Sequence, residues 1–451
     1  MHDIMLILSC LNQTLDKTSV RRLARIVEGL LAVTGRVTML GVSRWAERGG
    51  SYRTIQRFFT TTIDWAQVHW WLIRTHLLGE DTEWLLAGDE VVVTKSGKQT
   101  YGLGRFFSSL YGKTVPGLCF LNLSLINVNR GCSHTVRLEP ILKGPADSSP
   151  KGQKTGNKAK ASHRTNATPA KPKGRPKGSR NRNRREVVLS PYLVLVQGII
   201  RPVLALLGQQ IKLRYFVFDG AFGHHAALQM VRQTGLEMIC KLQHNAALYE
   251  PYRGAYSGRG PRRKYGDKLN YEQLPERHLK QDSVRDHIRT LIYQLPVWHK
   301  LFPDRLNVVI LVKINQRTQA RAHVILFSSD LSLDYERMIT FYRVRFQLEF
   351  QFRDAKQYWG LEDFMAVKQT PVYNSANLAL FMVSLSQVLI RPLREHCPAF
   401  SVLDLKALFR GWKYAREILK YLPQMPQPIS MDSIASQVAQ LGRINQPLVR
   451  A

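Results

Sequence analysis

Hydrophobic residues recur at every third or fourth position between residues 16 and 78, which predicts a series of amphipathic helices. Within this region, residues 42–48, a pair of glycines and residues 51–60 form a pattern typical of two helices joined by a tight turn. Arg53 and Arg57 would project from the second helix, as a helix that reads a DNA groove requires. An ordinary helical pair with solvated charges fits the pattern equally well, so both interpretations stay open.

Runs rich in Leu, Val, Ile and Phe follow, and they predict the strands of a mixed sheet. The runs are Trp84–Lys95, Gly117–Val128 and Leu213–Phe218. Residues 249–331 are first turn-rich and basic and then extended, which predicts an inserted β-rich subdomain. Helical periodicity returns over residues 334–361 and again over residues 374–422. The fold class expected from this order is α/β.

Composition adds charge to this picture. The 451 residues include 65 Lys and Arg against 33 Asp and Glu, a formal net charge of +32. Such a surface attracts polyanions, because counterions are released when basic side chains replace them. Nucleic acid is therefore the first partner expected, and an acidic membrane surface the second. The longest apolar run, Ala376–Ile390, is too short to cross a bilayer, so no membrane partner is expected.

The five cysteines lie far apart and show none of the paired spacing that a structural zinc site requires. They are expected to be core residues in a reducing compartment. The N-terminus lacks the basic segment and the cleavage site of a secretory signal. These features predict a cytoplasmic protein.

Residues 143–186 contain fourteen Lys or Arg against two acids, and almost no large apolar side chains. Such a segment cannot bury enough apolar surface to offset its chain entropy, so we expect it to be disordered without a ligand. Inside it, residues 172–178 have a Gly-Arg-Pro core that resembles an AT-hook, whose arginine enters a narrow A·T minor groove. Arg175 and Lys177 would make this contact. A basic linker that binds phosphates without reading sequence is the alternative.

Two aspartates follow hydrophobic runs, at positions where strands reach the rim of a sheet. Asp89 comes after Trp84–Gly88, and Asp219 comes after Tyr215–Phe218. Either residue alone fits an aspartate that caps a turn. Their significance depends on a third carboxylate, which Glu349 supplies from the helix expected after the insertion.

Glu349 shares one face of that helix with three other polar residues. At about 100° per residue, four side chains fall within about 60° of arc, beside a separate apolar stripe: Tyr342, Arg345, Glu349 and Lys356. A helical ion pair between Arg345 and Glu349, four residues apart, would explain those two residues alone. It does not explain why Tyr342 and Lys356 lie on the same line.

The spacing of these four residues matches the Tyr-Arg-Glu-Lys signature of a large group of bacterial insertion-sequence DDE transposases, which the chain resembles over about residues 84–364. Further matching blocks are Gly88-Asp89-Glu90, Asp219-Gly220-Ala221-Phe222 and Gly174-Arg175-Pro176-Lys177-Gly178-Ser179. The resemblance implies a ribonuclease-H-like core with the two aspartates on adjacent strands and Glu349 on a later helix, after a β-rich insertion. It also implies a bacterial, nucleoid-associated protein.

Three carboxylates suit phosphodiester chemistry, because negative charge builds on both the attacking and the leaving oxygen. Two Mg²⁺ or Mn²⁺ ions about 3.5–4 Å apart stabilise both oxygens, and these hard cations prefer oxygen ligands. Asp89 would bridge the two ions, while Asp219 and Glu349 would hold one each. Arg345 and Lys356 would contact DNA phosphates.

Two aromatic residues are also expected to contact DNA. Tyr342 would place its hydroxyl on a phosphate near the scissile bond. Members of this group are thought to extrude a base and stack it on an aromatic residue of the insertion. Trp298 is the candidate, since it is the only tryptophan between Asp219 and Glu349. A core tryptophan that packs the insertion onto the body is the alternative.

The function expected is a DNA transposase that binds terminal inverted repeats, pairs two ends in a homodimer, cleaves, and joins 3′-hydroxyls to target DNA. Another ribonuclease-H-fold nuclease and a domesticated, non-catalytic DNA-binding protein are the alternatives. The expected parts are a helical N-terminal DNA-binding region (1–80), a catalytic core in two pieces (81–142 and 187–248), a basic linker between them (143–186), a β-rich insertion (249–331), the signature helix (332–370) and a helical C-terminal region (371–451).

Overall fold

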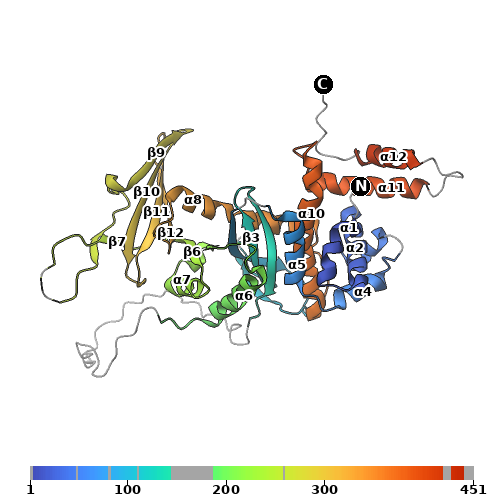
Figure 1. Cartoon of the computed structure of the whole chain (residues 1–451), viewed down its shortest axis with the longest axis horizontal. Coiled ribbons are helices and arrows are strands. Elements are labelled where there is room, and N and C mark those ends of the chain that lie inside the picture. Colours follow the sequence, from blue (N-terminus) through green and yellow to red (C-terminus); the bar gives the residue numbers. More distant parts are fainter. Residues whose placement is uncertain are drawn as a thin grey trace, which may run out of the picture.

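The computed structural model describes residues 4–46, 49–79, 83–108, 111–143, 186–256, 258, 260–419 and 428–440. Within these ranges the chain has a mixed α/β fold, in which helices pack around one large mixed sheet. Figure 1 shows the core of the sheet in the middle of the molecule, the insertion strands at one end and most helices at the other. The AT-hook-like segment with Arg175 and Lys177 lies outside the described residues.

The N-terminal region is helical. Its elements are α1 (Ile4–Leu8), η1 (Ser9–Gln13), α2 (Lys17–Ala32), α3 (Met39–Trp45), α4 (Tyr52–Thr60), α5 (Trp65–Leu72) and the π-helix η2 (Ile73–Leu77). The helices expected on either side of the paired glycines are α3 and α4, and α4 buries Ile55 and Phe58 while Arg53 and Arg57 are exposed. Helices α2 to α5 each begin at a side chain that accepts a backbone N–H of the first turn: Asp16, Thr38, Ser51 and Asp64.

A central strand, β1 (Trp84–Thr94), organises the core sheet. It pairs with β3 (Lys113–Asn127) in antiparallel and with β5 (Tyr215–Val217) in parallel direction. The sheet continues beyond β3 to β2 (Gly104–Ser108) and β4 (Cys132–Pro140), and beyond β5 to the parallel strand β6 (Glu237–Leu242). The helical connections of this part are α6 (Pro191–Leu207), η4 (Gly220–Phe222) and α7 (His225–Arg232).

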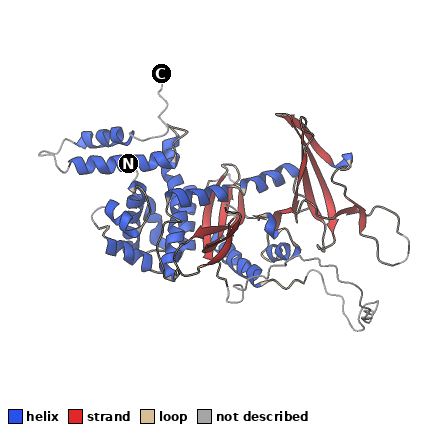
Figure 2. Ribbon diagram, turned by 180° about the vertical axis from the view of Figure 1, so that it is seen from behind, coloured by secondary structure: helices blue, strands red, loops and turns tan. Residues whose placement is uncertain are grey.

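The insertion extends the core sheet instead of forming a sheet of its own. Its last strand, β12 (Arg321–Ser328), pairs antiparallel with β6, and further strands of the insertion continue the sheet beyond β12. This pairing covers the edge of β6, which would otherwise present unpaired N–H and C=O groups. Figure 2 shows the long insertion strands beside the core. The remaining elements are β7 (Leu248–Pro251), β8 (Tyr265–Lys268), η5 (Glu276–His278), β9 (Leu279–Arg285), β10 (Ile288–His299) and β11 (Leu306–Asn315).

The segment with the four-residue signature is two helices, α8 (Tyr335–Val344) and α9 (Gln347–Tyr358). The prediction of one continuous helix over residues 334–361 is therefore wrong. Its apolar stripe is correct, since Phe341 in α8 and Leu348 in α9 are both buried in the core.

A tight turn at Arg345 and Phe346 separates the two helices. Both residues keep helical backbone angles, with φ and ψ of −53° and −32° for Arg345 and of −58° and −16° for Phe346. Three hydrogen bonds around them join residues three apart, as in a 3₁₀-helix: Phe346 N to Arg343 O, Leu348 N to Arg345 O and Glu349 N to Phe346 O. Each residue of such a turn rotates the chain by about 120°, compared with about 100° in an α-helix. A helix face predicted at 100° per residue is therefore displaced beyond the turn.

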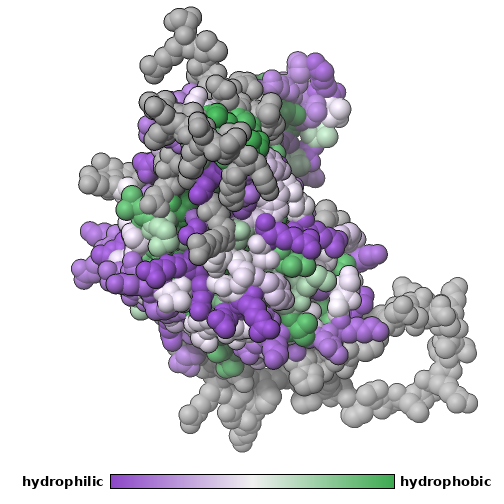
Figure 3. All heavy atoms as spheres, turned by 90° about the vertical axis from the view of Figure 1, so that its right-hand side faces the viewer, coloured by the Kyte–Doolittle hydropathy of each residue, from purple (hydrophilic) through white to green (hydrophobic). Residues whose placement is uncertain are grey.

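The C-terminal region consists of α10 (Gln369–Arg394), α11 (Val402–Leu419) and α12 (Pro428–Gln440), so the helix expected over residues 374–422 is also divided. α10 has 26 residues and, by length and composition alone, meets the criteria for a membrane span, but 72% of its most apolar window is buried inside the protein. It packs against α4, α5, α9 and β4 as a core helix. The helical end of the molecule is mainly hydrophilic on its surface, with separate hydrophobic areas (Figure 3).

Alternate residues of β1 and β5 face two different hydrophobic cores. Leu85, Ala87 and Val217 belong to the core that includes α8, α9 and α10. Leu86 and Phe216 belong to the core that includes α6 and α7. Because strand side chains alternate between faces, odd-numbered positions of β1 and β5 point towards α8 and α9.

Asn374, which is fully buried in α10, holds the N-terminal helices against that helix. Its Oδ1 accepts a hydrogen bond from Trp65 Nε1, and its Nδ2 donates to Phe59 O and Thr61 O, each at 2.8 Å. Asn374→Ala leaves one buried donor and two buried acceptors without partners. We expect a loss of about 3 kcal/mol or more in the free energy of unfolding, measured by denaturant titration.

The neighbouring Ser375→Ala is the control, since Ser375 Oγ donates only to Pro371 O within the same helix. It should cost about 1 kcal/mol or less. Equal losses for both variants would contradict the role assigned to Asn374.

Candidate active site

Asp89 and Asp219 lie just beyond the point where the parallel pairing of β1 with β5 ends. Asp219 follows β5, as expected, but β1 continues through Asp89 to Thr94, so the prediction that Asp89 lies at the end of its strand is wrong. The last paired residues of β1 and β5 are Ala87 and Val217, and each aspartate lies two residues further along. Neighbouring strands are about 4.8 Å apart, and side chains two residues apart point to the same face. Both carboxylates therefore lie on the face that packs against α8 and α9.

Arg345, in the turn between α8 and α9, joins the carboxylates. Its Nη1 donates a hydrogen bond to Asp89 Oδ2 at 2.8 Å, and its Nη2 lies 3.6 Å from Glu349 Oε1. The side chains of Arg345, Asp89 and Glu349 are 11%, 22% and 46% exposed. Asp219 interacts electrostatically with both Asp89 and Arg345. Arg345 thus contacts Asp89 and Glu349 directly, and Asp219 lies near enough to act on both Asp89 and Arg345 through its charge.

The position of Glu349 depends on the same turn. Glu349 lies in the first turn of α9, and its backbone N–H donates to Phe346 O within the turn that joins the two helices. The turn therefore sets the position of Glu349 relative to Arg345.

The electrostatics of the site favour a bound cation. Burial raises the pKa of Asp89 to about 6, Arg345 opposes this shift, and Asp219 and Glu349 add to it. At neutral pH Asp89 is ionised at an energetic cost, because desolvation and neighbouring negative charge both disfavour its carboxylate. A cation among the three carboxylates reduces this cost.

Tyr342 borders the three carboxylates from α8. Its ring is half-buried, and Arg345 Cζ lies 5.7 Å from the ring centroid. Burial raises the pKa of Tyr342 to about 12, although Arg345 opposes the shift, and Asp219 is among the groups that act on it. The phenol therefore keeps its proton at neutral pH and can donate a hydrogen bond.

Gln351 anchors α9 on the sheet behind the site. It is 2% exposed, and its Oε1 accepts hydrogen bonds from Ser124 Oγ at 2.9 Å, Asn122 Nδ2 at 3.3 Å and Ser133 Oγ at 3.5 Å. Asn122 is the partner of Asp89 across β1 and β3. Sequence reasoning missed this network, although polar Asn122 and Ser124 within an apolar strand were a signal for it.

Glu90 is a second residue that sequence reasoning missed. It points to the opposite face of β1 from Asp89 and accepts a hydrogen bond from Tyr192 Oη of α6. This contact attaches the chain after the basic linker to the strand that carries Asp89. The Asp89-Glu90 pair was the available signal, because adjacent strand residues serve opposite faces.

Lys356 is not placed among the carboxylates. Its Nζ donates to Val92 O at 2.9 Å and lies 2.8 Å from Glu362 Oε1. A phosphate contact by Lys356 would therefore compete with these two partners.

The other residues expected to contact DNA lie in separate parts of the fold. Trp298, in β10, is half-buried. The ring of Tyr265 packs edge-on against it, with 6.1 Å between the two ring centroids, and Lys264 Nζ lies 5.3 Å from the centroid of the Trp298 ring. These contacts are all within the insertion. Arg53 and Arg57 belong to the N-terminal helices and are not grouped with the carboxylates.

The donor set suits a hard divalent cation, because carboxylates supply the oxygen ligands that Mg²⁺ and Mn²⁺ prefer. In the described part of the chain, however, no three His, Cys, Asp or Glu side chains lie close enough to form a metal-binding group. The guanidinium of Arg345 contacts Asp89 at 2.8 Å and lies 3.6 Å from Glu349. The residues fit a metal by their chemistry, and in this structure Arg345 supplies the positive charge.

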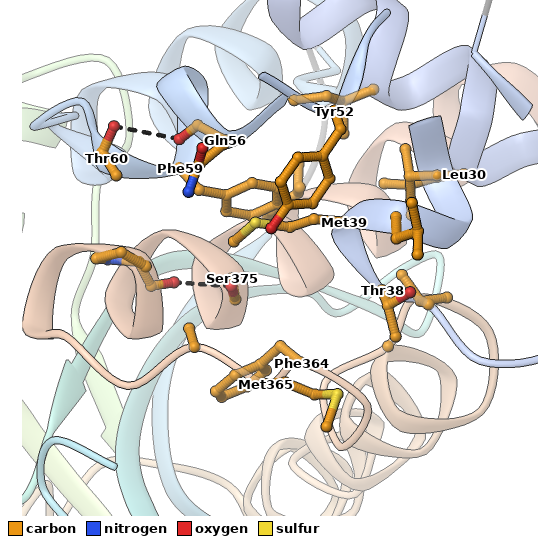
Figure 4. Close-up of a pocket in the computed structure, with 18 of the residues that line it drawn as sticks. Leu30, Thr38, Met39, Tyr52, Gln56, Phe59, Thr60, Phe364, Met365 and Ser375 are labelled. Atoms are coloured by element: carbon orange, nitrogen blue, oxygen red, sulfur yellow. Dashed lines mark hydrogen bonds between the residues drawn. The ribbon is translucent and has the colours of Figure 1, made fainter. Parts of the chain in front are cut away.

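An apolar cavity of about 500 Å³ lies apart from the carboxylates, between the N-terminal helices and α10. Figure 4 shows Tyr52 and Phe59 on one side of it, and Phe364 and Met365, from the loop after α9, on the other. Its lining contains no carboxylate. It therefore has no group suited to metal-dependent chemistry.

Comparison with known protein families agrees with this geometry. Residues 10–294 match the DDE superfamily endonuclease family, which is more than half of the chain, so the chain belongs to that family. No curated protein matches it. Membership implies a ribonuclease-H-like fold for the core sheet, nuclease activity and DNA as the substrate. Asp89 and Asp219 lie inside the matched residues, whereas the assignment of Glu349 depends on its position beside Arg345.

Metal affinity should depend on pH through Asp89. Below a pKa of about 6 its carboxyl group is protonated, and a proton must leave before a cation can bind. Affinity for Mn²⁺, measured by titration calorimetry, should rise about tenfold per pH unit below pH 6 and level off above it. A constant affinity between about pH 5 and pH 7.5 would contradict the coupling of metal binding to a carboxyl group with a pKa of about 6 at Asp89.

Proposed function

We propose that this DDE endonuclease is a transposase of the insertion-sequence group with the Tyr-Arg-Glu-Lys signature. The observation that carries the proposal is the 2.8 Å ion pair between Arg345 and Asp89, because Arg345 also lies 3.6 Å from Glu349. Asp89, Asp219 and Glu349 would hold two Mg²⁺ or Mn²⁺ ions, with Asp89 between them. When bound, these ions would stabilise negative charge on the attacking and leaving oxygens.

The proposed reaction exchanges one phosphodiester oxygen for another in two steps. In the first step a water oxygen attacks the phosphorus at the transposon end, and the 3′-oxygen of the transposon strand leaves and takes up a proton. In the second step this 3′-hydroxyl attacks a phosphorus of the target DNA, loses its proton, and the target 3′-oxygen leaves. Both steps need the same arrangement of oxygens around one phosphate, so one group of carboxylates serves both.

Arg345 and Tyr342 would then bind the phosphate on which the reaction occurs. The planar guanidinium of Arg345 donates two parallel N–H bonds, which match two phosphate oxygens. Tyr342 is already within reach of the same guanidinium and keeps its hydroxyl proton. Metal binding to Asp89 and Glu349 would release Arg345 from its carboxylate partners for this contact.

Recognition of the transposon ends would use basic and aromatic side chains outside the carboxylate site. Arg53 and Arg57 are exposed on α4, next to buried residues that fix the helix. Trp298 would stack on an extruded base, with Lys264 near the phosphate beside it. Two chains would pair two ends as a dimer, so that both ends are cut in one complex. The net charge of +32 supports contact with DNA over a large surface.

Asp219→Ala should abolish joining of DNA ends. The assay contains Mg²⁺ or Mn²⁺, a DNA that carries the inverted repeats flanking the coding region, and a target plasmid. We expect strand transfer by the wild type. The rate of strand transfer should decrease about 10³-fold or more in the variant, because Asp89 and Asp219 would act on the same phosphate. Asp432→Ala, an exposed residue of α12, is the matched control and should retain wild-type joining.

Two results would contradict the proposal and distinguish its alternatives. Binding to the ends without cleavage, by wild type and variant alike, would indicate a non-catalytic DNA-binding protein. Cleavage of structured DNA without joining would indicate a nuclease of the same fold.

A further inference from the structure

A cavity of about 610 Å³ lies on the side of α9 away from β1, between the turn that joins β3 to β4 and the C-terminal end of α10. None of the three proposed catalytic carboxylates lines it. Four arginines do: Arg130, Arg353, Arg391 and Arg394. We call this the arginine cavity.

The charge of the arginine cavity is strongly unbalanced. Its one carboxylate, Asp354, is already paired with Arg353 at 2.9 Å. In the described ranges, Arg130, Arg391 and Arg394 form no ion pair with any acid, and Arg394 donates its Nε to Phe400 O. Three positive charges thus face one hollow without counter-charges.

Helix electrostatics explain only part of this arrangement. Arg391 and Arg394 lie in the last turn of α10, where the C-terminal carbonyl groups of a helix favour positive charge. Arg130 comes from a strand turn far away in the sequence and has no such reason to be there. Helix electrostatics therefore do not explain why Arg130 lies beside Arg391 and Arg394.

Gln351 supplies a neutral donor in the lining of the cavity. Its Oε1 already accepts bonds from Ser124, Ser133 and Asn122, which fixes the orientation of its amide. Its Nε2 has no partner in the described chain, although the residue is 2% exposed. A buried donor without an acceptor is destabilising, so an acceptor from outside the chain is favoured here.

His134 completes this polar lining. It is 1% exposed, its Nδ1 also has no hydrogen-bond partner among the described residues, and its Nε2 lies 3.6 Å from Cys132 Sγ. The lining therefore combines buried polar groups with three guanidinium groups that have no acidic partner among the described residues. A ligand that suits it is anionic and rich in acceptor oxygens.

We propose that the arginine cavity binds the phosphodiester backbone of DNA that extends beyond the carboxylate site. Arg353 lies one helical turn after Glu349 on α9, so a DNA strand whose phosphate lies at Glu349 can continue into the cavity over a short distance. This inference depends on the proposed function only for the position of that strand. The DNA is either the transposon end or the target, and both present the same phosphate oxygens.

The test compares Arg130→Ala/Arg391→Ala with Arg201→Ala, an exposed arginine of α6 on the opposite side of the sheet. Binding of a short duplex with the end sequence is measured in EDTA at several salt concentrations, so that no cleavage occurs. Joining of pre-cut ends to an unrelated plasmid is measured separately. Arg130→Lys/Arg391→Lys restores the charge and should recover most of any loss.

If the cavity holds the transposon end, the double alanine variant should bind the duplex about tenfold more weakly, with the salt slope reduced by about 2. If it holds target DNA, duplex binding stays normal and joining of pre-cut ends decreases about tenfold. The thermal midpoint should not change in either case. Binding and joining both equal to those of Arg201→Ala would overturn the proposal.

Failure of the proposed function gives a different result. If the wild type neither cuts nor joins DNA and the double alanine variant binds DNA more weakly, the transposase function is contradicted and DNA binding by the arginine cavity is supported. If joining requires Asp219 but the double alanine variant binds and joins DNA like the wild type, only the proposed DNA binding by the arginine cavity is contradicted.

Discussion

Mutual repulsion of three carboxylates is the constraint on which this structure depends. Two like charges about 4 Å apart repel by about 4 kcal/mol at the effective dielectric of a protein surface, so such a group requires a cation. Arg345 is that cation here, in contact with Asp89 and near Glu349. Since Arg345 lies in the turn between α8 and α9, the same residue fixes the electrostatics and the geometry. Burial raises the pKa of Asp89 above its ordinary value, Arg345 opposes that shift, and the charges of Asp219 and Glu349 add to it.

The remainder of the fold holds this group in place. β1 and β5 bring Asp89 and Asp219 to one face of the sheet, next to the end of their parallel pairing, and α10 covers the other side of the helices that carry Arg345 and Glu349. Hydrogen bonds connect α9 to the sheet on both sides of Glu349: Ser124 of β3 donates to Gln351 Oε1, and Ser133 of β4 donates to Gln347 O. The insertion extends the same sheet through β12 and β6, which makes it a continuation of the core.

Much of this arrangement was predictable from the sequence, because periodic hydrophobic positions determine which face of a strand or helix is buried. The strands that carry Asp89 and Asp219 and the apolar stripe through Phe341 and Leu348 follow from that rule. The break at Arg345 and Phe346 does not. Neither residue is Gly or Pro, so local propensity gives no signal for it.

Other features depend on contacts between residues that are distant in the sequence. The pairing of β12 with β6 joins the insertion to the core through backbone hydrogen bonds, which do not depend on side-chain identity. The convergence of Arg130 with Arg391, and the contact of Lys356 with β1, require the folded arrangement of α9 and α10 on the sheet. A hydrophobic pattern records which residues are buried and does not record which segments meet.

The most direct test of the central claim is the location of Mn²⁺ by anomalous scattering in crystals of the protein grown above pH 7 with that metal. We predict two ions about 3.5–4 Å apart, ligated by Asp89, Asp219 and Glu349, with Arg345 turned away from Asp89. Crystals in which Mn²⁺ binds elsewhere, while the ion pair of Arg345 with Asp89 remains at 2.8 Å, would contradict it.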